Sequence, residues 1–121
     1  MARAGLLAAL GMEHHLQPLQ VPTGWIVVFN DFREIDPTHV AEDDRYAILK
    51  EDLLQLTNDQ FNRVLNVGWY PSGNLADGAY GLVVYEGDCE GKLLFELRTH
   101  DRGQLVAQVE RLLEEVCDGR I

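Results

Sequence analysis

The sequence predicts an α+β fold: a mostly antiparallel sheet of four to five strands, with a C-terminal helix packed on one face and a short helix after the first strand. Three observations predict this fold. Short runs rich in β-branched and aromatic residues recur along the chain. A tight, glycine-flanked connection joins the last two runs. A stretch with helical periodicity closes the chain, and a helix with one apolar stripe buries that stripe against the sheet.

The first expected strand is residues 25–29, WIVVF. Its side chains are apolar on both faces, which is typical of a strand in the middle of a sheet, so we place it at the centre. Residues 17–23, with Pro18 and Pro22, are expected to lead into it in an extended conformation. Residues 30–40 predict a polar loop with a turn at its Asp-Pro pair.

A short helix is expected next, over about residues 44–50. Acidic residues at its start complement the helix dipole, and Asp43 or Asp44 can accept hydrogen bonds from the free N–H groups. Residues 51–57 leave two alternatives: they continue the helix, or they form a short strand with alternating leucines. We favour the strand.

The next three expected strands are residues 63–70, 80–85 and 92–98. The tight connection 87–91 makes the last two an antiparallel hairpin. In the last strand Leu93, Phe95 and Leu97 alternate with charged residues, so one face of this strand is expected to meet water.

The closing helix is expected to begin after Asp101 and to stop at Gly119. Gln104 stands three residues after Asp101, which is the spacing of a capping box. The apolar residues at helical spacing are Leu105, Val106, Val109, Leu112, Leu113 and Val116. The opposite face is polar, so the helix is expected to pack one stripe on the sheet and leave the other in water.

Two aromatic residues, Trp69 and Tyr70, stand side by side at the end of an expected strand. Adjacent side chains of a strand point to opposite faces, so both cannot enter the same core. We expect Trp69 to pack inward and Tyr70 to face outward. Pro71 is expected to end the strand, so that the following loop stands clear.

The 121 residues suit one domain, which we assign to 24–121, with 1–23 as an N-terminal arm or lead-in. The apolar run 4–11 has no convincing cleavage site, so no signal peptide is expected, and Met12 offers an alternative start. No window approaches the ~20 apolar residues of a membrane span. The two cysteines lack a C-x-x-C spacing, which predicts free thiols in a reducing, cytoplasmic setting.

Nucleophilic catalysis finds little support in the sequence. The single serine, Ser72, lies in a Pro-Ser-Gly turn without the G-x-S-x-G elbow. Cys117 falls near the end of the closing helix, and Cys89 lies between two acids. Both settings disfavour a thiolate. We therefore expect no catalytic residue.

Cofactor and metal motifs are also missing from the sequence. The glycine-rich stretch 73–81 lacks the G-K-[ST] of a phosphate-binding loop, and the acids of 31–36 do not match a calcium loop. His14 and His15 lack a third ligand at metal-site spacing. His100 and Asp101 are adjacent, a poor arrangement for a catalytic dyad. We expect no cofactor and no metal.

The charge of the chain indicates its class of partner. Twenty acids against ten bases give a formal net charge of −10. This charge disfavours direct binding to nucleic acid or to an anionic membrane, because phosphate is repelled. It favours a basic protein, which it would attract and orient. The alternative is a solvated surface that only confers solubility.

The acids concentrate in residues 31–59, which contain nine acidic and three basic residues. We take this segment as a candidate docking surface and add the expected outward tyrosine, because tyrosine is a favoured interface anchor. The candidate partner-binding residues are Asp31, Glu34, Asp36, Glu42, Asp43, Asp44, Tyr70 and Asp77.

Four stretches carry a resemblance to a known class of proteins: WIVVFNDF with the following Asp-Pro, then EDLL, then VGWYP, and FELR before the closing helix. From about Trp25 to the end, the chain resembles small immunity proteins of bacterial polymorphic toxin and contact-dependent growth inhibition systems. The resemblance implies a cytoplasmic, non-enzymatic inhibitor. Its partner would be the C-terminal toxin domain of a neighbouring gene product, often a basic nuclease. Contact residues vary between such pairs, so the resemblance assigns none.

Two other functions stay open at this point. One is a self-associating adaptor or housekeeping protein, in which an exposed strand edge pairs with a second copy. The other is a small hydrolase that uses Asp31, Glu34 or His100, which requires a cleft that brings these groups together.

Overall fold

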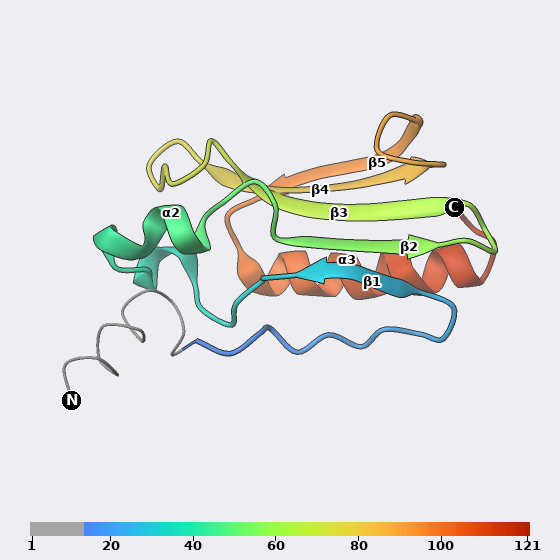
Figure 1. Ribbon diagram of the computed structural model, residues 1–121, viewed down its shortest axis with the longest axis horizontal. Coiled ribbons are helices and arrows are strands. Elements are labelled where there is room, and N and C mark those ends of the chain that lie inside the picture. Colours follow the sequence, from blue (N-terminus) through green and yellow to red (C-terminus); the bar gives the residue numbers. More distant parts are fainter. Residues whose placement is uncertain (1–13) are drawn as a thin grey trace.

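The structure, a computed structural model, describes residues 14–121 as one sheet with a long helix against one face (Figure 1). The five strands are β1 (Ile26–Asn30), β2 (Leu54–Asn58), β3 (Arg63–Tyr70), β4 (Ala79–Glu86) and β5 (Lys92–Thr99). All neighbours are antiparallel, in the order β1-β2-β3-β4-β5. The helix is α3 (Arg102–Cys117). The expected α+β fold is confirmed; the expectations for the apolar run 4–11 and for Met12 lie outside the described residues.

β1 lies at an edge of the sheet, so its expected central position is wrong. Among the described strands it pairs with β2 alone. Its apolar side chains are half exposed: Ile26 at 54%, Val27 at 48% and Val28 at 51%. The cause is the strand order, because a chain that runs strand by strand across a sheet leaves its first strand at the edge. An apolar run by itself does not distinguish a strand covered on both faces from an uncovered edge strand.

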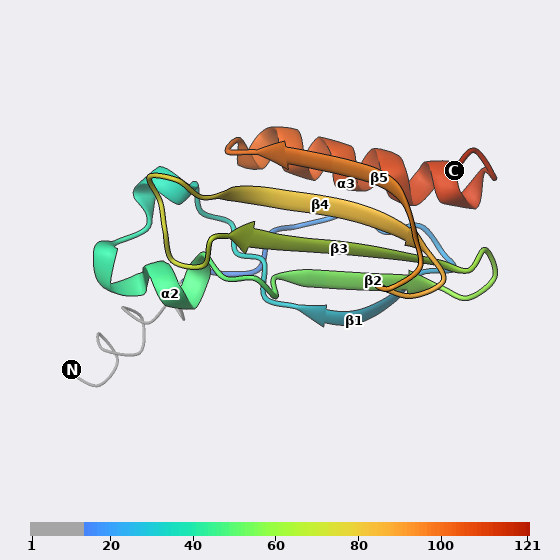
Figure 2. The same ribbon diagram turned by 90° about the horizontal axis from the view of Figure 1, so that it is seen from above.

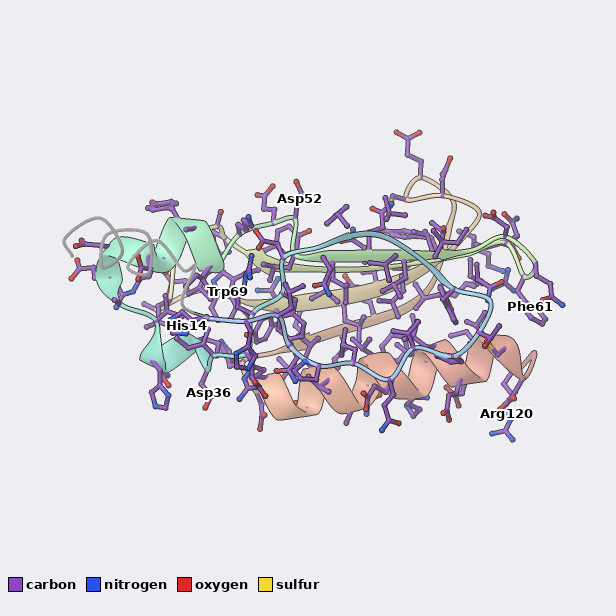
Figure 3. The ribbon with its side chains drawn as sticks, turned by 60° about the horizontal axis from the view of Figure 1, so that its bottom comes forward. His14, Asp36, Asp52, Phe61, Trp69 and Arg120 are labelled. Atoms are coloured by element: carbon purple, nitrogen blue, oxygen red, sulfur yellow. The ribbon has the colours of Figure 1, made fainter. Side chains whose placement is uncertain are left out.

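The lead-in to β1 is extended, as expected, and it runs beside α3 (Figures 1 and 3). Gln17 accepts a hydrogen bond from Arg102 near the start of α3. The backbone N–H of Gln20 donates to Glu110 at 2.7 Å. The Cys117 thiol lies 3.8 Å from a lead-in carbonyl near the end of the helix. These contacts span the length of α3, so residues 17–23 form part of the layer that covers the sheet.

The segment between β1 and β2 contains three short helical turns: η2 (Pro37–His39), η3 (Glu42–Asp44) and α2 (Arg45–Ile48). The short helix is therefore confirmed, and residues 54–58 form the favoured strand. The expected side-chain cap by Asp43 or Asp44 is wrong, because neither turn has a side-chain cap hydrogen bond. The preceding turn already supplies an acceptor, since the N–H of Arg45 donates to the carbonyl of Glu42.

α3 begins and ends as expected. Asp101 accepts a hydrogen bond from the N–H of Gln104 at 3.1 Å. The Gln104 side chain does not return to Asp101; its Oε1 accepts a hydrogen bond from the hydroxyl of Thr99. The Thr99 hydroxyl oxygen in turn accepts from the N–H of Asp101 at 3.1 Å. At the other end Gly119 adopts φ +72°, and the N–H groups of residues 119 and 120 close a Schellman motif on the last turn.

The core lies between α3 and the covered face of the sheet (Figure 2). The fully buried helix residues are Leu105, Val109, Leu112, Leu113 and Val116. They belong to one cluster with Leu56, Leu65, Val67, Leu82 and Val84 of β2, β3 and β4. Each buried side chain of this size contributes about 1.5–3 kcal/mol of hydrophobic stabilisation, so this layer dominates the stability of the fold.

β5 keeps the expected alternation only in its second half. Phe95 and Leu97 are partly buried against the core, opposite Val84 and Leu82. The register shifts between Val84 and Tyr85, so Leu93 pairs with Tyr85 and is 44% exposed. The inward position expected for Leu93 is therefore wrong, because a β-bulge breaks the period of two.

Candidate binding groove

The face of the sheet opposite α3 carries a groove of about 610 Å³. In Figure 2, α3 and the lead-in lie on the same side of the sheet, and no helix among the described residues covers the other side. The groove is lined by Asp52, Gln55, Asn66, Tyr70, Gly81, Val83, Tyr85, Cys89, Glu96 and Arg98. Strands β2 to β5 and the β4–β5 hairpin contribute to it, so the groove depends on the pairing of these four strands.

The floor of the groove is built by a tyrosine lying over two glycines. Gly68 and Gly81 are opposite each other on β3 and β4. A Cβ at Gly68 would lie 2.8 Å from the Tyr70 ring, and one at Gly81 would lie 3.2 Å from it. The Tyr70 hydroxyl donates to the carbonyl of Glu51 at 3.3 Å. The missing side chains thus leave the space that the ring occupies, and this hydrogen bond holds its end.

The expected division of the two adjacent aromatics is confirmed. Trp69 is fully buried on the α3 side, whereas Tyr70 lines the groove on the other. The Trp69 ring makes edge contacts with Tyr80 at 5.0 Å and with His100 at 6.3 Å between ring centroids. Its indole N–H donates to the carbonyl of Asn74 at 2.9 Å.

The loop that follows Tyr70 does not stand clear, contrary to the expectation. Its Asn74 carbonyl accepts the hydrogen bond from the indole of Trp69. Its Gly73 N–H donates to the carbonyl of Leu49 at 2.6 Å. The ring of Tyr46 lies against Gly73, where a Cβ would be only 2.5 Å away. A buried indole N–H requires an acceptor, and the loop folds back to provide one.

The groove is acidic at its rim. Asp52 and Glu96 are exposed lining carboxylates, and Arg98 is the one cation among the lining residues. Arg98 donates to the backbone carbonyl of Tyr70 at 3.2 Å. Burial raises the pKa of the Tyr70 hydroxyl, and the negative charges of Glu51 and Asp52 raise it further. Among the lining residues of the part of the chain that the structure describes, carboxylates thus outnumber cations.

Polar groups at the hairpin end of the groove are neutral. The Asn66 side-chain amide donates to Gln55 Oε1 at 3.2 Å, and the Cys89 thiol lies 3.8 Å from the same oxygen. Burial raises the pKa of Cys89, and the charges of Asp88 and Glu90 add to this effect. The thiol is thus protonated at neutral pH, which agrees with the expectation that it is not an activated nucleophile.

Three of the seven acids predicted to bind a partner contact basic side chains within the protein, and a fourth is buried. Asp31 contacts Arg33 and Lys50, Glu34 contacts His15 at 2.5 Å, and Asp36 contacts Arg102 at 3.0 Å. Asp44 is buried. The remaining three, Glu42, Asp43 and Asp77, are exposed. None of the seven lines the groove, and Tyr70 alone of the eight candidates does.

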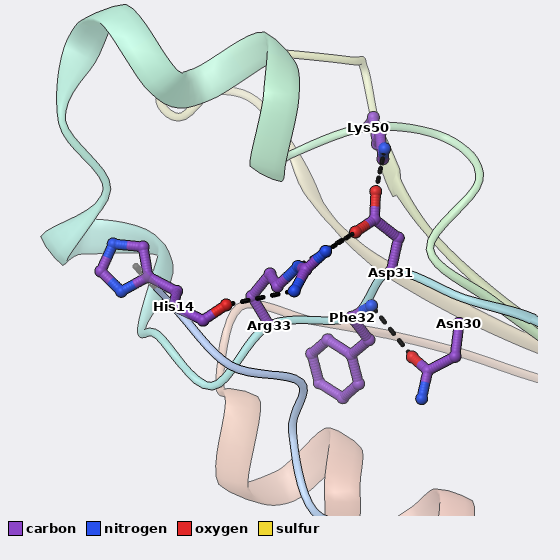
Figure 4. A network of polar contacts seen from close by, with 6 residues as sticks. All are labelled: His14, Asn30, Asp31, Phe32, Arg33 and Lys50. Carbon is purple, nitrogen blue, oxygen red and sulfur yellow. Dashed lines mark hydrogen bonds and ion pairs between the residues drawn. The ribbon is translucent and has the colours of Figure 1, made fainter. Parts of the chain in front are cut away.

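Asp31 is the centre of a structural network rather than a free carboxylate (Figure 4). Arg33 Nε donates to Asp31 at 3.0 Å, and the same guanidinium donates to the carbonyl of His14 at 3.2 Å. Burial by itself raises the pKa of Asp31, but the hydrogen bonds and charges of Lys50 and Arg33 outweigh it and lower the pKa. The network ties the lead-in, the end of β1 and the segment before β2 together.

Sequence reasoning missed Asp52, Tyr85, Glu96 and Arg98 as groove residues. In the sequence, Asp52 is one of nine acids in its segment and has no distinguishing feature. Glu96 and Arg98 indicated only that one face of β5 is exposed to water. The alternation along β3, β4 and β5 could have placed the side chains of Tyr70, Tyr85 and Glu96 on one face. The strand order that brings them together is a non-local property.

The three groups considered for a hydrolase do not come together in either of the two hollows found among residues 14–121. A smaller hollow of about 330 Å³ is lined by Asp36, Pro37, Thr38, His100, Asp101 and Arg102. Of Asp31, Glu34 and His100, only the histidine lines it. Its two carboxylates are occupied, that of Asp36 by Arg102 and that of Asp101 by the N–H of Gln104.

Two further findings concern residues 14–121 as a whole. They contain no group of three or more His, Cys, Asp or Glu side chains that could hold a metal ion. They also contain no helix that is long and apolar enough to cross a membrane. In comparisons with known proteins, the chain matches no protein-family model, no curated protein and no solved structure.

Proposed function

We propose that this protein is an inhibitor of the immunity type, which binds a basic toxin domain through the open face of its sheet and performs no chemistry itself. The observation that carries the proposal is the groove on that face, with a tyrosine floor and an acidic rim, on a chain of net charge −10. The proposed setting is the cytoplasm, where Cys89 and Cys117, both free thiols, would stay reduced.

The composition of the open face suits a protein partner. Tyr70 and Tyr85 supply large amphipathic surfaces of the kind that anchor protein interfaces. Carboxylates at the rim attract a cationic surface and speed its approach. The same carboxylates repel phosphate, which disfavours nucleic acid as the ligand.

A second part of the acidic surface lies outside the groove. Glu42 and Asp43 are exposed beside Tyr46, whose side chain is 76% exposed, and Asp77 is exposed in the loop after β3. We expect these charges to contribute mainly to the association rate, as rim charges do. Changing Glu42 and Asp43 to lysine should therefore slow association more than it speeds dissociation.

The test is titration calorimetry of this protein against the C-terminal domain encoded by the neighbouring gene. We expect a dissociation constant in about the nanomolar range that rises when salt is raised from about 50 mM to about 500 mM. Asp52→Lys at the groove should weaken binding. Glu114→Lys, which reverses an exposed carboxylate on α3, is the matched control and should not.

Two outcomes would count against the proposal. Absence of binding would remove the toxin domain as the partner. An equal loss in Asp52→Lys and Glu114→Lys would mean that net charge alone governs binding and that the open face is not the docking surface.

Self-association is the second candidate, because one observation favours it: β1 is an edge strand with Ile26, Val27 and Val28 about half exposed. Edge strands of monomers usually carry charges that prevent pairing, and this run carries none. Sedimentation velocity of the protein alone tests the candidate. A dimer that Val28→Lys dissociates, while Leu93→Lys on the other edge strand leaves it intact, would support it. A monomer at all concentrations would exclude it.

A further inference from the structure

We infer that the groove receives one arginine side chain of the protein partner, with its guanidinium on the ring of Tyr70 and its charge facing Asp52 and Glu96. This inference rests on the proposed function and names the chemical group that the open face recognises. It follows from the shape of the groove, the arrangement of its aromatic rings and the balance of its charges.

The shape of the groove suits a side chain that enters from outside. Its volume of about 610 Å³ falls within the range of about 300–1,000 Å³ typical of sites for small ligands. Two tyrosines line it from neighbouring strands, Tyr70 on β3 and Tyr85 on β4. Because Gly68 and Gly81 have no side chains, Tyr70 lies over the sheet and leaves the space above it open.

The chemistry of the groove matches a guanidinium. This group is planar, stacks on aromatic rings and offers five N–H donors to carboxylates and amide oxygens. The groove offers a tyrosine ring and two exposed carboxylates. A lysine ammonium would use the carboxylates but would gain less from the ring and from the spread of acceptors.

The charge balance favours a cation over an anion. The lining residues include the carboxylates of Asp52 and Glu96 and the cation of Arg98, and Glu51 is next to Asp52 in the chain. Arg98 donates to the backbone carbonyl of Tyr70, so one of its nitrogens already has an acceptor. Burial is the main cause of the raised pKa of the Tyr70 hydroxyl, and the charges of Glu51 and Asp52 add to it, so both carboxylates act on this residue.

The experiment uses the full chain and needs no partner. A titration of the ¹⁵N-labelled protein with N-acetyl-arginine-N-methylamide is followed by the shifts of its amide NMR signals. We expect a dissociation constant in about the millimolar range, because so small a ligand buries little surface. The shifts should map to the side-chain amides of Gln55 and Asn66 and to the backbone N–H of Gly81. The citrulline analogue, which has nearly the same shape and no charge, should cause none.

Two variants test the named contacts. Glu96→Gln changes an exposed side chain and should weaken binding of the arginine analogue at least about threefold, since one counter-ion is lost. Tyr70→Leu should weaken it by a similar factor through loss of the ring. Glu114→Gln on α3 is the control and should bind as the wild type does.

Several results would overturn the inference. Equal shifts with the citrulline analogue would show that charge plays no part. Unchanged binding by Glu96→Gln would place the cation elsewhere. Shifts at Arg98 with inorganic phosphate, and none with the arginine analogue, would make the groove an anion site. A toxin domain that binds tightly while the arginine analogue does not bind would leave the proposed function standing and remove this inference alone.

Discussion

At the scale of single residues, the groove depends on where side chains are missing. Gly68 and Gly81 form one cross-strand pair, and the ring of Tyr70 fills the space beside them. The two positions differ in what surrounds them. A Cβ at Gly68 would lie 2.0 Å from the backbone carbonyl of Glu51, whereas a Cβ at Gly81 would meet only the Tyr70 ring.

This difference predicts unequal effects of one added methyl group. Gly68→Ala should lower the free energy of unfolding by about 3 kcal/mol, because a backbone carbonyl cannot move away without disturbing the sheet. Gly81→Ala should lower it by less than about 1 kcal/mol, because a side chain can shift by a few tenths of an ångström. Urea denaturation followed by circular dichroism measures both. Equal losses would contradict the assignment of the clash to the Glu51 carbonyl.

A second residue-scale prediction concerns Asp31. Its pKa is lowered from 3.8 in the folded state, because Lys50 and Arg33 outweigh the effect of burial. A carboxyl with a depressed folded pKa contributes stability that is present above its unfolded pKa and lost as pH falls through the folded value. The wild type should therefore exceed Asp31→Asn in free energy of unfolding at neutral pH.

The measurement is urea denaturation of both proteins from about pH 7 to about pH 2.5. The difference between them should be constant above about pH 5 and should shrink below the unfolded pKa of about 4. A difference that grows on acidification would mean that the Asp31 carboxylate is not stabilised by its cationic neighbours.

At the scale of elements, the sequence predicts the ends of the long helix well and the two edge strands poorly. α3 has a side-chain cap at its start and a glycine in positive φ after its end, and both were predicted from sequence. β1 and β5 are the two edge strands, and each contains a shift in register. Leu93 is exposed beside the bulge of β5, which no alternation pattern predicts.

The cap of α3 yields a third prediction. Asp101→Ala should lower the free energy of unfolding by about 1 kcal/mol, because the N–H of Gln104 loses its acceptor. Asp118→Ala is the matched control at the other end of the helix. A negative charge there opposes the helix dipole, so its removal should be neutral or slightly stabilising. Thermal or urea unfolding of the two variants measures both effects. A larger loss of unfolding free energy in Asp118→Ala than in Asp101→Ala would be inconsistent with the cap.

At the scale of the whole molecule, charge sets the conditions for folding and for binding. The net charge of −10 disfavours the compact state through self-repulsion. Several acids escape this effect because they contact cations within the fold, as Asp31, Asp36 and Glu115 do. The acids of the β4–β5 hairpin, Glu86, Asp88 and Glu90, form a separate group. Within residues 14–121, only Glu86 of these three contacts a cation, Arg63.

This excess predicts that added salt stabilises the protein. The thermal midpoint should rise by a few degrees between about 10 mM and about 200 mM sodium chloride, because screening reduces repulsion among exposed carboxylates. The double variant Asp88→Lys and Glu90→Lys, with a formal net charge of −6, should show a smaller rise. Differential scanning calorimetry provides the measurement. A fall in midpoint with salt would show that internal ion pairs outweigh the repulsion.

By itself the sequence determined those parts of the protein that depend on neighbours along the chain. The period and caps of α3, the strand 63–70 and the hairpin through 87–91 were predicted because hydrogen bonding and side-chain direction in these elements follow local patterns. The opposite directions of Trp69 and Tyr70 followed from the same rule.

Only the tertiary structure decided which strand lies at the edge, which acids are neutralised and where a partner would find a groove. Strand order places β1 outermost, and it gathers Asp52, Tyr70 and Glu96 on one face although they are far apart in the sequence. Folding also pairs Asp31 and Asp36 with cations, while Asp52 remains exposed. In the sequence these three carboxylates cannot be told apart, because each carries the same charge. Only the fold sets how far each carboxylate lies from a positive charge, and this distance determines their interaction energy.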